Sequence, residues 1–146
     1  MDPPTTTKNS TMNKTFIDTS AFIALTDSSD KNHVAASNYL KKLISKHIPL
    51  LTSNFVVDES ITRIKRALGI EPAIIFRNSL KSSSQLEIIY IDDKIEDLAW
   101  EIMQKYKDQK FSYTDCTSFA LMRMRKTGIA FTFDKHFKIA GFEIVP

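Results

Sequence analysis

The chain has 146 residues, the length of one ordinary domain, and its single cysteine excludes an intrachain disulfide. Hydrophobic residues make up 42% and charged residues 25% of the chain, a balance that supports a packed core. The net charge of +3 permits a nucleic-acid partner without requiring one. No apolar run approaches the ~20 residues that span a membrane, and the polar N-terminus does not have the pattern of a secretory signal. We therefore expect a soluble, cytoplasmic protein.

Two regions follow from the sequence pattern. Residues 1–13 are rich in Pro, Thr and Asn and are predicted to form a disordered tail. Residues 14–146 are predicted to form a single domain, in which strand-like apolar runs alternate with helical patterns. In chain order, the expected elements are a strand over 15–18, helices over 20–25 and 33–46, an apolar strand-like run over 48–53, helices over 54–69 and 71–83, a strand over 85–92, helices over 93–107 and 112–128, and strands over 129–134 and 142–146.

This alternation predicts the fold class. Strands separated by helices need crossover connections, which favour parallel pairing. We therefore expect an α/β sandwich with a central, mostly parallel sheet of four to five strands. In such sheets, ligands bind outside the carboxyl ends of the strands. Acidic side chains at that edge are the first candidates for a functional site.

Four carboxylates from separate segments are placed to meet there. Asp18 and Asp134 end two of the predicted strands, Asp115 lies in the first turn of the helix over 112–128, and Glu59 lies early in the helix over 54–69. Taken singly, each has an ordinary explanation as a helix cap, a turn residue or a solvated helix residue. Taken together, crowded carboxylates repel one another, and a bound divalent cation relieves that repulsion.

The helix residue among the four is ambiguous. Val57, Ile61, Ile64 and Leu68 form an apolar stripe, and Glu59 falls opposite that stripe at ~100° per residue. Asp58 is therefore an alternative ligand, and the pattern does not choose between them. An all-oxygen set suits Mg²⁺ or Mn²⁺. The chain does not suit zinc, because it has one cysteine and because His33, His47 and His136 lack ligand spacing.

At these positions the chain resembles a known family, the PIN-domain ribonucleases, and within them the VapC-type toxins of toxin–antitoxin pairs. The similarity covers nearly all of residues 14–146, and the closing TFDKHF…GFEIVP is especially similar. The stretches that carry it are FIDTSAFIAL, LTSNFVVDESITRIKRALG, SYTDCTSFALMRMRKTG and AFTFDKHFKIAGFEIVP.

The resemblance implies a PIN-like α/β/α sandwich whose acidic pocket binds Mg²⁺ or Mn²⁺. It implies homodimers and an antitoxin protein as partner. It favours Glu59 over Asp58, and it places Thr19, Ser20 and Thr132 as supporting polar residues. The implied catalytic and metal-binding residues are Asp18, Glu59, Asp115 and Asp134.

The chemistry these residues permit is hydrolysis of RNA phosphodiester bonds by metal-activated water. An acidic pocket repels RNA, so basic side chains must flank it. The candidates are Arg63, Arg66, Arg123 and Lys135, although solvated helix faces explain such clusters equally well. Cys116 is expected to be a packed core thiol, and a lone histidine such as His136 is a weak signal for a general acid.

Other interpretations remain open. A receiver domain or a dehalogenase-type phosphatase also has acids at strand ends, but these need a second acid beside the first, where this chain has Thr19 and Ser20. A non-catalytic PIN-like module that binds RNA or protein is disfavoured by the complete acidic set. A PIN nuclease that processes RNA outside a toxin system cannot be separated from a toxin by these residues.

Overall fold

Five parallel strands form one sheet in the order β3-β2-β1-β4-β5. The computed structural model describes residues 14–146, so the tail predicted over residues 1–13 lies outside the described residues. The prediction of a mostly parallel α/β sandwich with four to five strands is confirmed. The strands are β1 (Thr15–Ile17), β2 (Leu50–Ser53), β3 (Leu86–Ile89), β4 (Ile129–Phe131) and β5 (Glu143–Val145).

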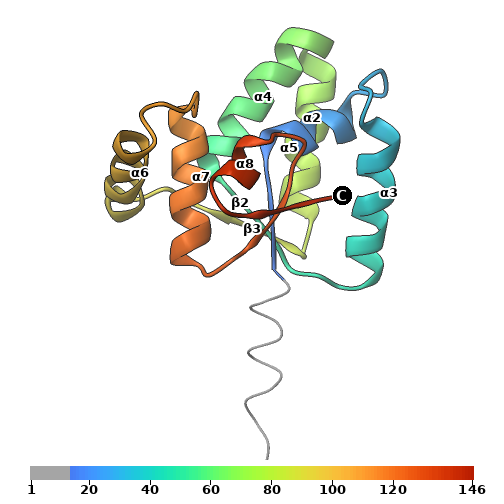
Figure 1. The fold of residues 1–146 in the computed structure, drawn as a ribbon. Helices are drawn as coiled ribbons and strands as arrows, with labels where there is room; N and C mark the ends of the chain where they lie inside the picture. Colours follow the sequence, from blue (N-terminus) through green and yellow to red (C-terminus); the bar gives the residue numbers. More distant parts are fainter. Residues whose placement is uncertain (1–13) are drawn as a thin grey trace, which may run out of the picture.

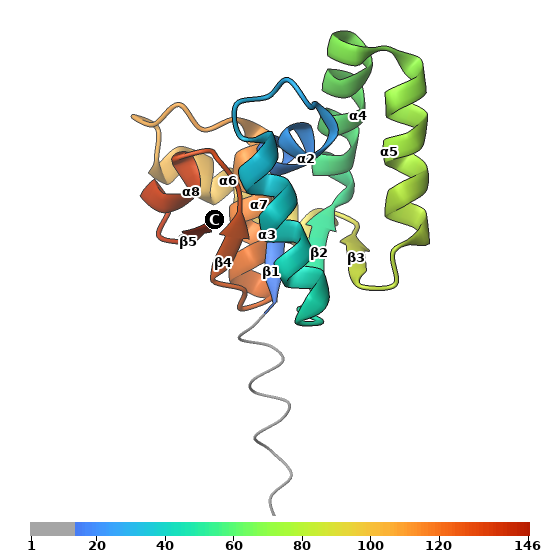
Figure 2. The ribbon, with the colours of Figure 1, turned by 90° about the vertical axis from the view of Figure 1, so that its right-hand side faces the viewer.

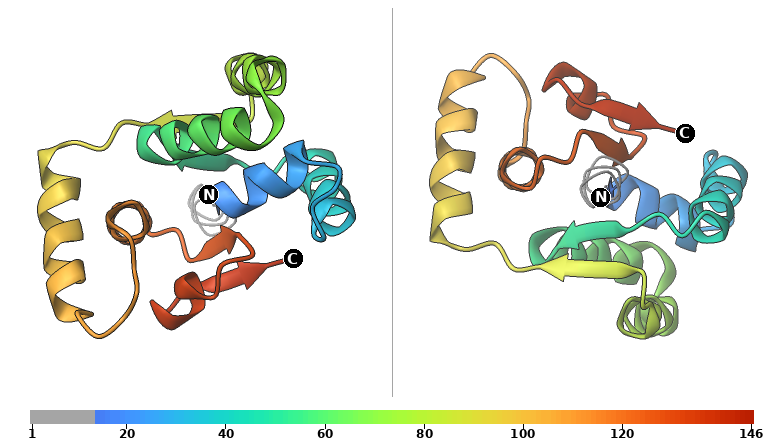
Figure 3. Two further views of the ribbon diagram at one scale, coloured as in Figure 1. Left: turned by 90° about the horizontal axis from the view of Figure 1, so that it is seen from above. Right: turned by 90° about the horizontal axis from the view of Figure 1, so that it is seen from below.

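Helices lie on both sides of this sheet (Figure 1). Seen along the strands, α7 with α6 against it lies on one side, and α2 and α3 lie on the other (Figure 3). The paired helices α4 and α5 rise beyond the carboxyl ends of the strands (Figure 2). The helices are α2 (Thr19–Thr26), α3 (His33–Ser45), α4 (Asn54–Leu68), α5 (Ile70–Ser82), α6 (Asp93–Lys105), α7 (Tyr113–Met124) and α8 (His136–Ile139).

The core is centred on α7 and the two middle strands. Every residue of α7 from Cys116 to Met122 is buried, and Phe16 of β1 and Phe131 of β4 are fully buried. As expected, Cys116 is a packed core thiol, and its burial raises the pKa of the thiol to about 11. This packing fixes the start of α7 at the carboxyl edge of β1 and β4.

Several predicted boundaries need correction. The strand expected over 129–134 ends at Phe131, so Asp134 follows it by three residues and does not end the strand directly. The helix expected over 112–128 ends at Met124, and the short helix α8 was not predicted. A four-residue helix such as HFKI is too short for a helical period to show in the sequence.

The buried face of α4 also differs from the predicted stripe. Val56, Ser60 and Ile64 are its buried residues, whereas Leu68 is 37% exposed. The reason is that α4 packs against α2, α5 and α7 at once, so its contact surface is broader than one stripe and is centred one residue earlier. This shift changes where Glu59 points, as described below.

Within residues 14–146, no helix is long and apolar enough to cross a membrane.

Candidate active site

Asp18 stands at the carboxyl end of β1, in the middle of the sheet. It follows Ile17 directly and is the N-cap of α2. Its backbone N–H donates to the carbonyl of Phe131 on the neighbouring strand at 3.1 Å, which continues the pairing of β1 with β4 by one residue. The residue is only 5% exposed, so its carboxylate is held inside the edge of the sheet rather than in open water.

Two hydroxyl groups hold this buried carboxylate. Thr132 Oγ1 donates to Asp18 Oδ2 at 3.0 Å, and Ser20 Oγ donates to the same oxygen at 3.2 Å. The hydroxyls of Ser20 and Thr132 lie 3.0 Å apart, and the backbone N–H of Phe133 donates to Ser20 Oγ at 2.9 Å. This network links the loop after β4 to the start of α2. The polar roles predicted for Ser20 and Thr132 therefore have a structural counterpart.

Thr19, the third predicted supporting residue, contributes its backbone N–H to Asp18 and not its side chain. It is buried, and its hydroxyl oxygen has no hydrogen-bond partner among the residues that the structure describes. A buried hydroxyl without a partner is uncommon in folded proteins.

Asp134 and Asp115 come together at one histidine. The backbone N–H of Asp134 donates to Thr132 Oγ1 at 3.0 Å, which joins Asp134 to the same network as Asp18. His136 Nδ1 lies 3.3 Å from Asp134 Oδ1 and 3.3 Å from Asp115 Oδ2. One possible metal-ligand atom from each of these three residues lies within 4.8 Å of the other two, a spacing that can hold a metal ion.

A reciprocal helix cap fixes Asp115. Ser112 Oγ accepts from the backbone N–H of Asp115, and Asp115 Oδ2 accepts from the backbone N–H of Ser112, both at 3.0 Å. This capping box satisfies two amide groups at the start of α7. Asp115 thus has the structural role that its position predicts and also faces the other acids, because capping occupies only part of its acceptor capacity.

The surroundings of two acids in the cluster, Asp18 and Asp115, disfavour the charged form of the carboxyl group. Burial raises the pKa of Asp18 to about 6, and the nearby charges of Asp115 and Asp134 add to that shift. Burial also raises the pKa of Asp115, with Asp134 as a further cause. Hydrogen bonds to Asp18 from the backbone of Thr19 and the side chain of Thr132 oppose the first shift without cancelling it. The backbone hydrogen bond from Ser112 opposes the shift of Asp115 in the same way. Carboxylates in this state are stabilised by a nearby cation.

Glu59 and Asp58, the two rivals on α4, lie on different surfaces. Asp58 is exposed, whereas Glu59 is half-buried one turn after Phe55. The ring of Phe55 lies 6.4 Å from that of Tyr113 at the start of α7. The face of α4 that carries Glu59 is therefore turned toward the helix that carries Asp115. The structure shows no hydrogen bond between Glu59 and the other acids in the described residues.

The predicted basic residues are spread over the molecule. Lys135 is exposed beside Asp134, and Arg63 and Arg66 are exposed on the part of α4 beyond the sheet edge. Arg123 lies in the last turn of α7, about 12 Å along the helix from Asp115. There the neighbouring Arg125 pairs with Glu87 near the start of β3 at 3.5 Å. The structure thus places Arg123 at the opposite end of α7 from the acids.

His136 is the residue that sequence reasoning undervalued. Its spacing to Asp134 is visible in the sequence, but its approach to Asp115 depends on how α7 packs beside β4. The HF pair that begins two residues after the last acid is the signal in the sequence, since buried Phe137 anchors the turn that carries His136.

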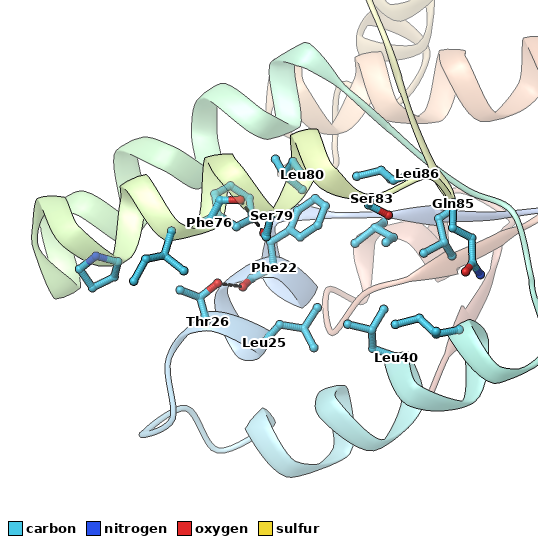
Figure 4. Close-up of a pocket in the computed structure, with 15 residues that line it drawn as sticks. Phe22, Leu25, Thr26, Leu40, Phe76, Ser79, Leu80, Ser83, Gln85 and Leu86 are labelled. Carbon is cyan, nitrogen blue, oxygen red and sulfur yellow. Dashed lines mark hydrogen bonds between the residues drawn. The ribbon is translucent and has the colours of Figure 1, made fainter.

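An apolar groove lies apart from the acids, between α2, α3 and α5 (Figure 4). Its volume is about 650 Å³, and no charged side chain of the described residues lines it. Phe22, Leu40 and Phe76 point into it. Its lining therefore has no carboxylate, imidazole or thiol that would hold a metal.

Comparisons with known proteins agree with the fold. The family model of the PIN domain matches residues 15–143. The 23S rRNA-specific endonuclease VapC20 of Mycobacterium tuberculosis is 32% identical over 128 residues, which cover 87% of this chain and 94% of that protein.

Solved structures show the same similarity. The crystal structure of Mycobacterium tuberculosis VapC20, described as a sarcin-ricin loop cleaving toxin, matches with a TM-score of 0.80 and 31% identity over 90% of this chain and 99% of that one. DNA-bound VapBC from Salmonella typhimurium shares the fold, with a TM-score of 0.68 and 16% identity over 91% of this chain and 97% of that one. The chain belongs to the PIN-domain family and, within it, to the VapC-type toxins.

Proposed function

We propose that this protein is a metal-dependent endoribonuclease that hydrolyses RNA phosphodiester bonds, and that it is the toxin of a toxin–antitoxin pair. The observation that supports this most directly is the convergence of Asp18, Asp115 and Asp134 at one edge of the sheet in a PIN-family chain. The similarity to a 23S rRNA-specific endonuclease supports RNA as the substrate. We expect the protein to act in the cytoplasm.

The donor set fits a divalent cation, Mg²⁺ or Mn²⁺. Asp115 and Asp134 each bring a carboxylate oxygen to one cluster, and Thr132 links the buried Asp18 to Asp134. Carboxylate oxygens are the ligands that these ions prefer. We assign Asp18, Asp115 and Asp134 as the residues that hold it, with Glu59 completing the set from α4. When bound, such an ion activates water as a nucleophile and offsets negative charge on the phosphate.

The remaining residues act by positioning. Thr132 and Ser20 orient Asp18 by donating to one of its oxygens. The capping box fixes the orientation of the Asp115 carboxylate. Thr132 also accepts a hydrogen bond from the backbone N–H of Asp134 and so holds that residue in place. Lys135, next to the acids, and Arg63 and Arg66, on the projecting helix, are positioned to attract the RNA backbone.

The proposed partners are an antitoxin protein and a second copy of this chain. Complexes such as the VapBC of Salmonella typhimurium and the VapBC2 of Rickettsia felis share this fold. A toxin that cuts cellular RNA needs an inhibitor while the cell grows, and an antitoxin supplies it.

The decisive experiment is cleavage of RNA by purified protein. The substrates are a panel of structured RNAs that includes 23S rRNA, each incubated with Mg²⁺, with Mn²⁺ and with chelator. Asp18→Asn and Asp115→Asn test the site, and Asp58→Asn serves as the matched control because Asp58 is an exposed acid. We expect metal-dependent cleavage that the first two variants lose and the control retains. Equal cleavage by all variants would refute the site assignment.

A further inference from the structure

We propose that Nδ1 of His136 is a ligand of the catalytic cation, beside Asp115 and Asp134, and that the site therefore prefers first-row transition ions to Mg²⁺. This inference rests on the proposed function, because it concerns the same cation. It goes further by adding a nitrogen atom to an oxygen set and by predicting which ions the site selects.

The distances around His136 support ligation. Nδ1 lies 3.3 Å from one oxygen of each carboxylate. Two ligand atoms that are each about 2.1 Å from one ion, and roughly at right angles, lie about 3 Å apart. The observed separations are therefore close to those between neighbouring ligands of a common ion.

A hydrogen bond alone explains these distances less well. A neutral imidazole has at most one hydrogen on Nδ1, so it can point at only one of the two carboxylates at a time. Charge-assisted bonds between nitrogen and a carboxylate are usually about 2.7–2.9 Å long, shorter than both observed distances. Two equal and long separations are better explained by three atoms arranged around a shared space.

The imidazole is also held in place for this task. The ring of His136 packs edge-on against Phe111, with ring centroids 5.2 Å apart. The backbone N–H of His136 donates to Asp134 Oδ1 at 2.9 Å, which fixes the turn that carries the ring. A ligand whose orientation is set before the ion arrives loses little freedom on binding.

The chemical consequence is selectivity. Imidazole nitrogen is a preferred ligand of ions such as Fe²⁺, Co²⁺ and Ni²⁺, whereas Mg²⁺ prefers oxygen and keeps most of its water. Loss of one nitrogen ligand should therefore weaken Co²⁺ binding most, Mn²⁺ binding less and Mg²⁺ binding least. If His136 only positioned Asp115, its removal would weaken all three ions by the same factor.

The first experiment uses the unaltered protein. Mn²⁺ is bound at substoichiometric concentration, and pulsed electron paramagnetic resonance is used to look for nitrogen coupled to the ion. We expect a nitrogen signal of the imidazole type. Its absence from a protein that binds Mn²⁺ would refute the inference without any reliance on the folding of a variant.

The second experiment identifies the nitrogen. His136→Asn is compared with His47→Asn, a matched control, because His47 is exposed and has a φ of 54°, which asparagine tolerates well. We expect His136→Asn alone to lose the nitrogen signal and to bind Co²⁺ at least about 10-fold more weakly, while Mg²⁺ affinity changes less than about threefold. Equal weakening of Co²⁺ and Mg²⁺ would refute the inference.

These results are separable from a failure of the proposed function. If the protein cuts RNA with metal but the bound Mn²⁺ has no nitrogen neighbour, the inference is wrong and the nuclease assignment stands. If neither Mn²⁺ nor Co²⁺ binds and no RNA is cut with any ion, both fail.

Discussion

Thr132 directly follows β4, just as Asp18 directly follows β1. Ile17 pairs with Phe131 across the two strands, so the residues that follow them are neighbours, and Thr132 Oγ1 donates to Asp18 Oδ2 at 3.0 Å. The same oxygen of Thr132 accepts from the backbone N–H of Asp134. One hydroxyl therefore joins two acids that lie 116 positions apart in the chain.

Replacing that hydroxyl should weaken catalysis with little change in shape. Thr132→Val keeps the branched side chain but removes the hydrogen bonds of the hydroxyl with Asp18, Asp134 and Ser20. We therefore expect a 10- to 100-fold loss of kcat/KM, roughly the effect of losing a group that orients a metal ligand. Steady-state cleavage of RNA measures it. Thr132→Ser keeps the hydroxyl and should retain most of the activity. Equal losses in both variants would contradict the role of the hydrogen bonds.

The raised pKa of Asp18 predicts how stability depends on pH. In protein stripped of metal, the folded state keeps the Asp18 proton up to a pH of about 6, whereas the unfolded chain releases it near 3.8. Between these values the folded state binds more protons, so the free energy of unfolding falls as pH rises through the window. The upper bound on this loss is about 3 kcal/mol. Asp115, whose pKa is also raised, contributes in the same direction.

Asp18→Asn should remove that loss. Urea unfolding in chelator is expected to show the variant more stable than the native protein at pH 7.5, with a smaller difference at pH 4. Adding Mn²⁺ should make the native protein the more stable of the two, because a ligand stabilises only the protein that binds it. A difference that does not vary with pH would show that burial of the charge is not its cause.

Glu59 and Asp58 are predicted to behave differently despite being neighbours. Glu59→Gln should lower kcat/KM by roughly 10- to 100-fold, because Glu59 lies one turn after Phe55, whose ring lies near Tyr113 on the helix that carries Asp115. Asp58→Asn should leave it unchanged, because Asp58 is exposed. Thermal unfolding of both variants controls for structural damage. The opposite pattern would make Asp58 the ligand on α4.

The basic residues near the acids should contribute to RNA binding, and those far from the acids should not. Lys135→Ala is expected to weaken RNA binding and to lower the salt dependence of binding by about one released counterion, whereas Arg123→Ala should change neither. Fluorescence anisotropy over a range of salt concentrations, with chelator present to prevent cleavage, measures both quantities. A larger effect at Arg123 would place the RNA on the far end of α7.

Much of the fold could be predicted because its signals are local. The alternation of short apolar runs with helices predicts the parallel sheet, and the carboxyl-edge rule then places Asp18 and Asp115 together. The buried face of α4 could not be predicted, because it depends on three neighbouring helices. The true end of β4 was also missed, since Thr132 and Phe133 have the residue types of a strand and only the turn toward α8 ends it.

Only part of the site could be predicted, because some of its residues meet only through tertiary contacts. Acids at element ends are visible in the sequence, whereas the approach of His136 to Asp115 is a tertiary contact between residues 21 positions apart. Sequence spacing alone does not show that His136 lies beside Asp115.

The position of β1 between β2 and β4 has a consequence for how the protein is made. Asp18 is among the first residues of the domain to leave the ribosome, but Thr132 and Asp134, which complete its surroundings, are among the last. The central strand must wait for a neighbour that is synthesised more than 100 residues later. A growing chain therefore has no assembled acidic centre beside the ribosome that makes it, and the centre forms only once the C-terminal strands have joined the sheet.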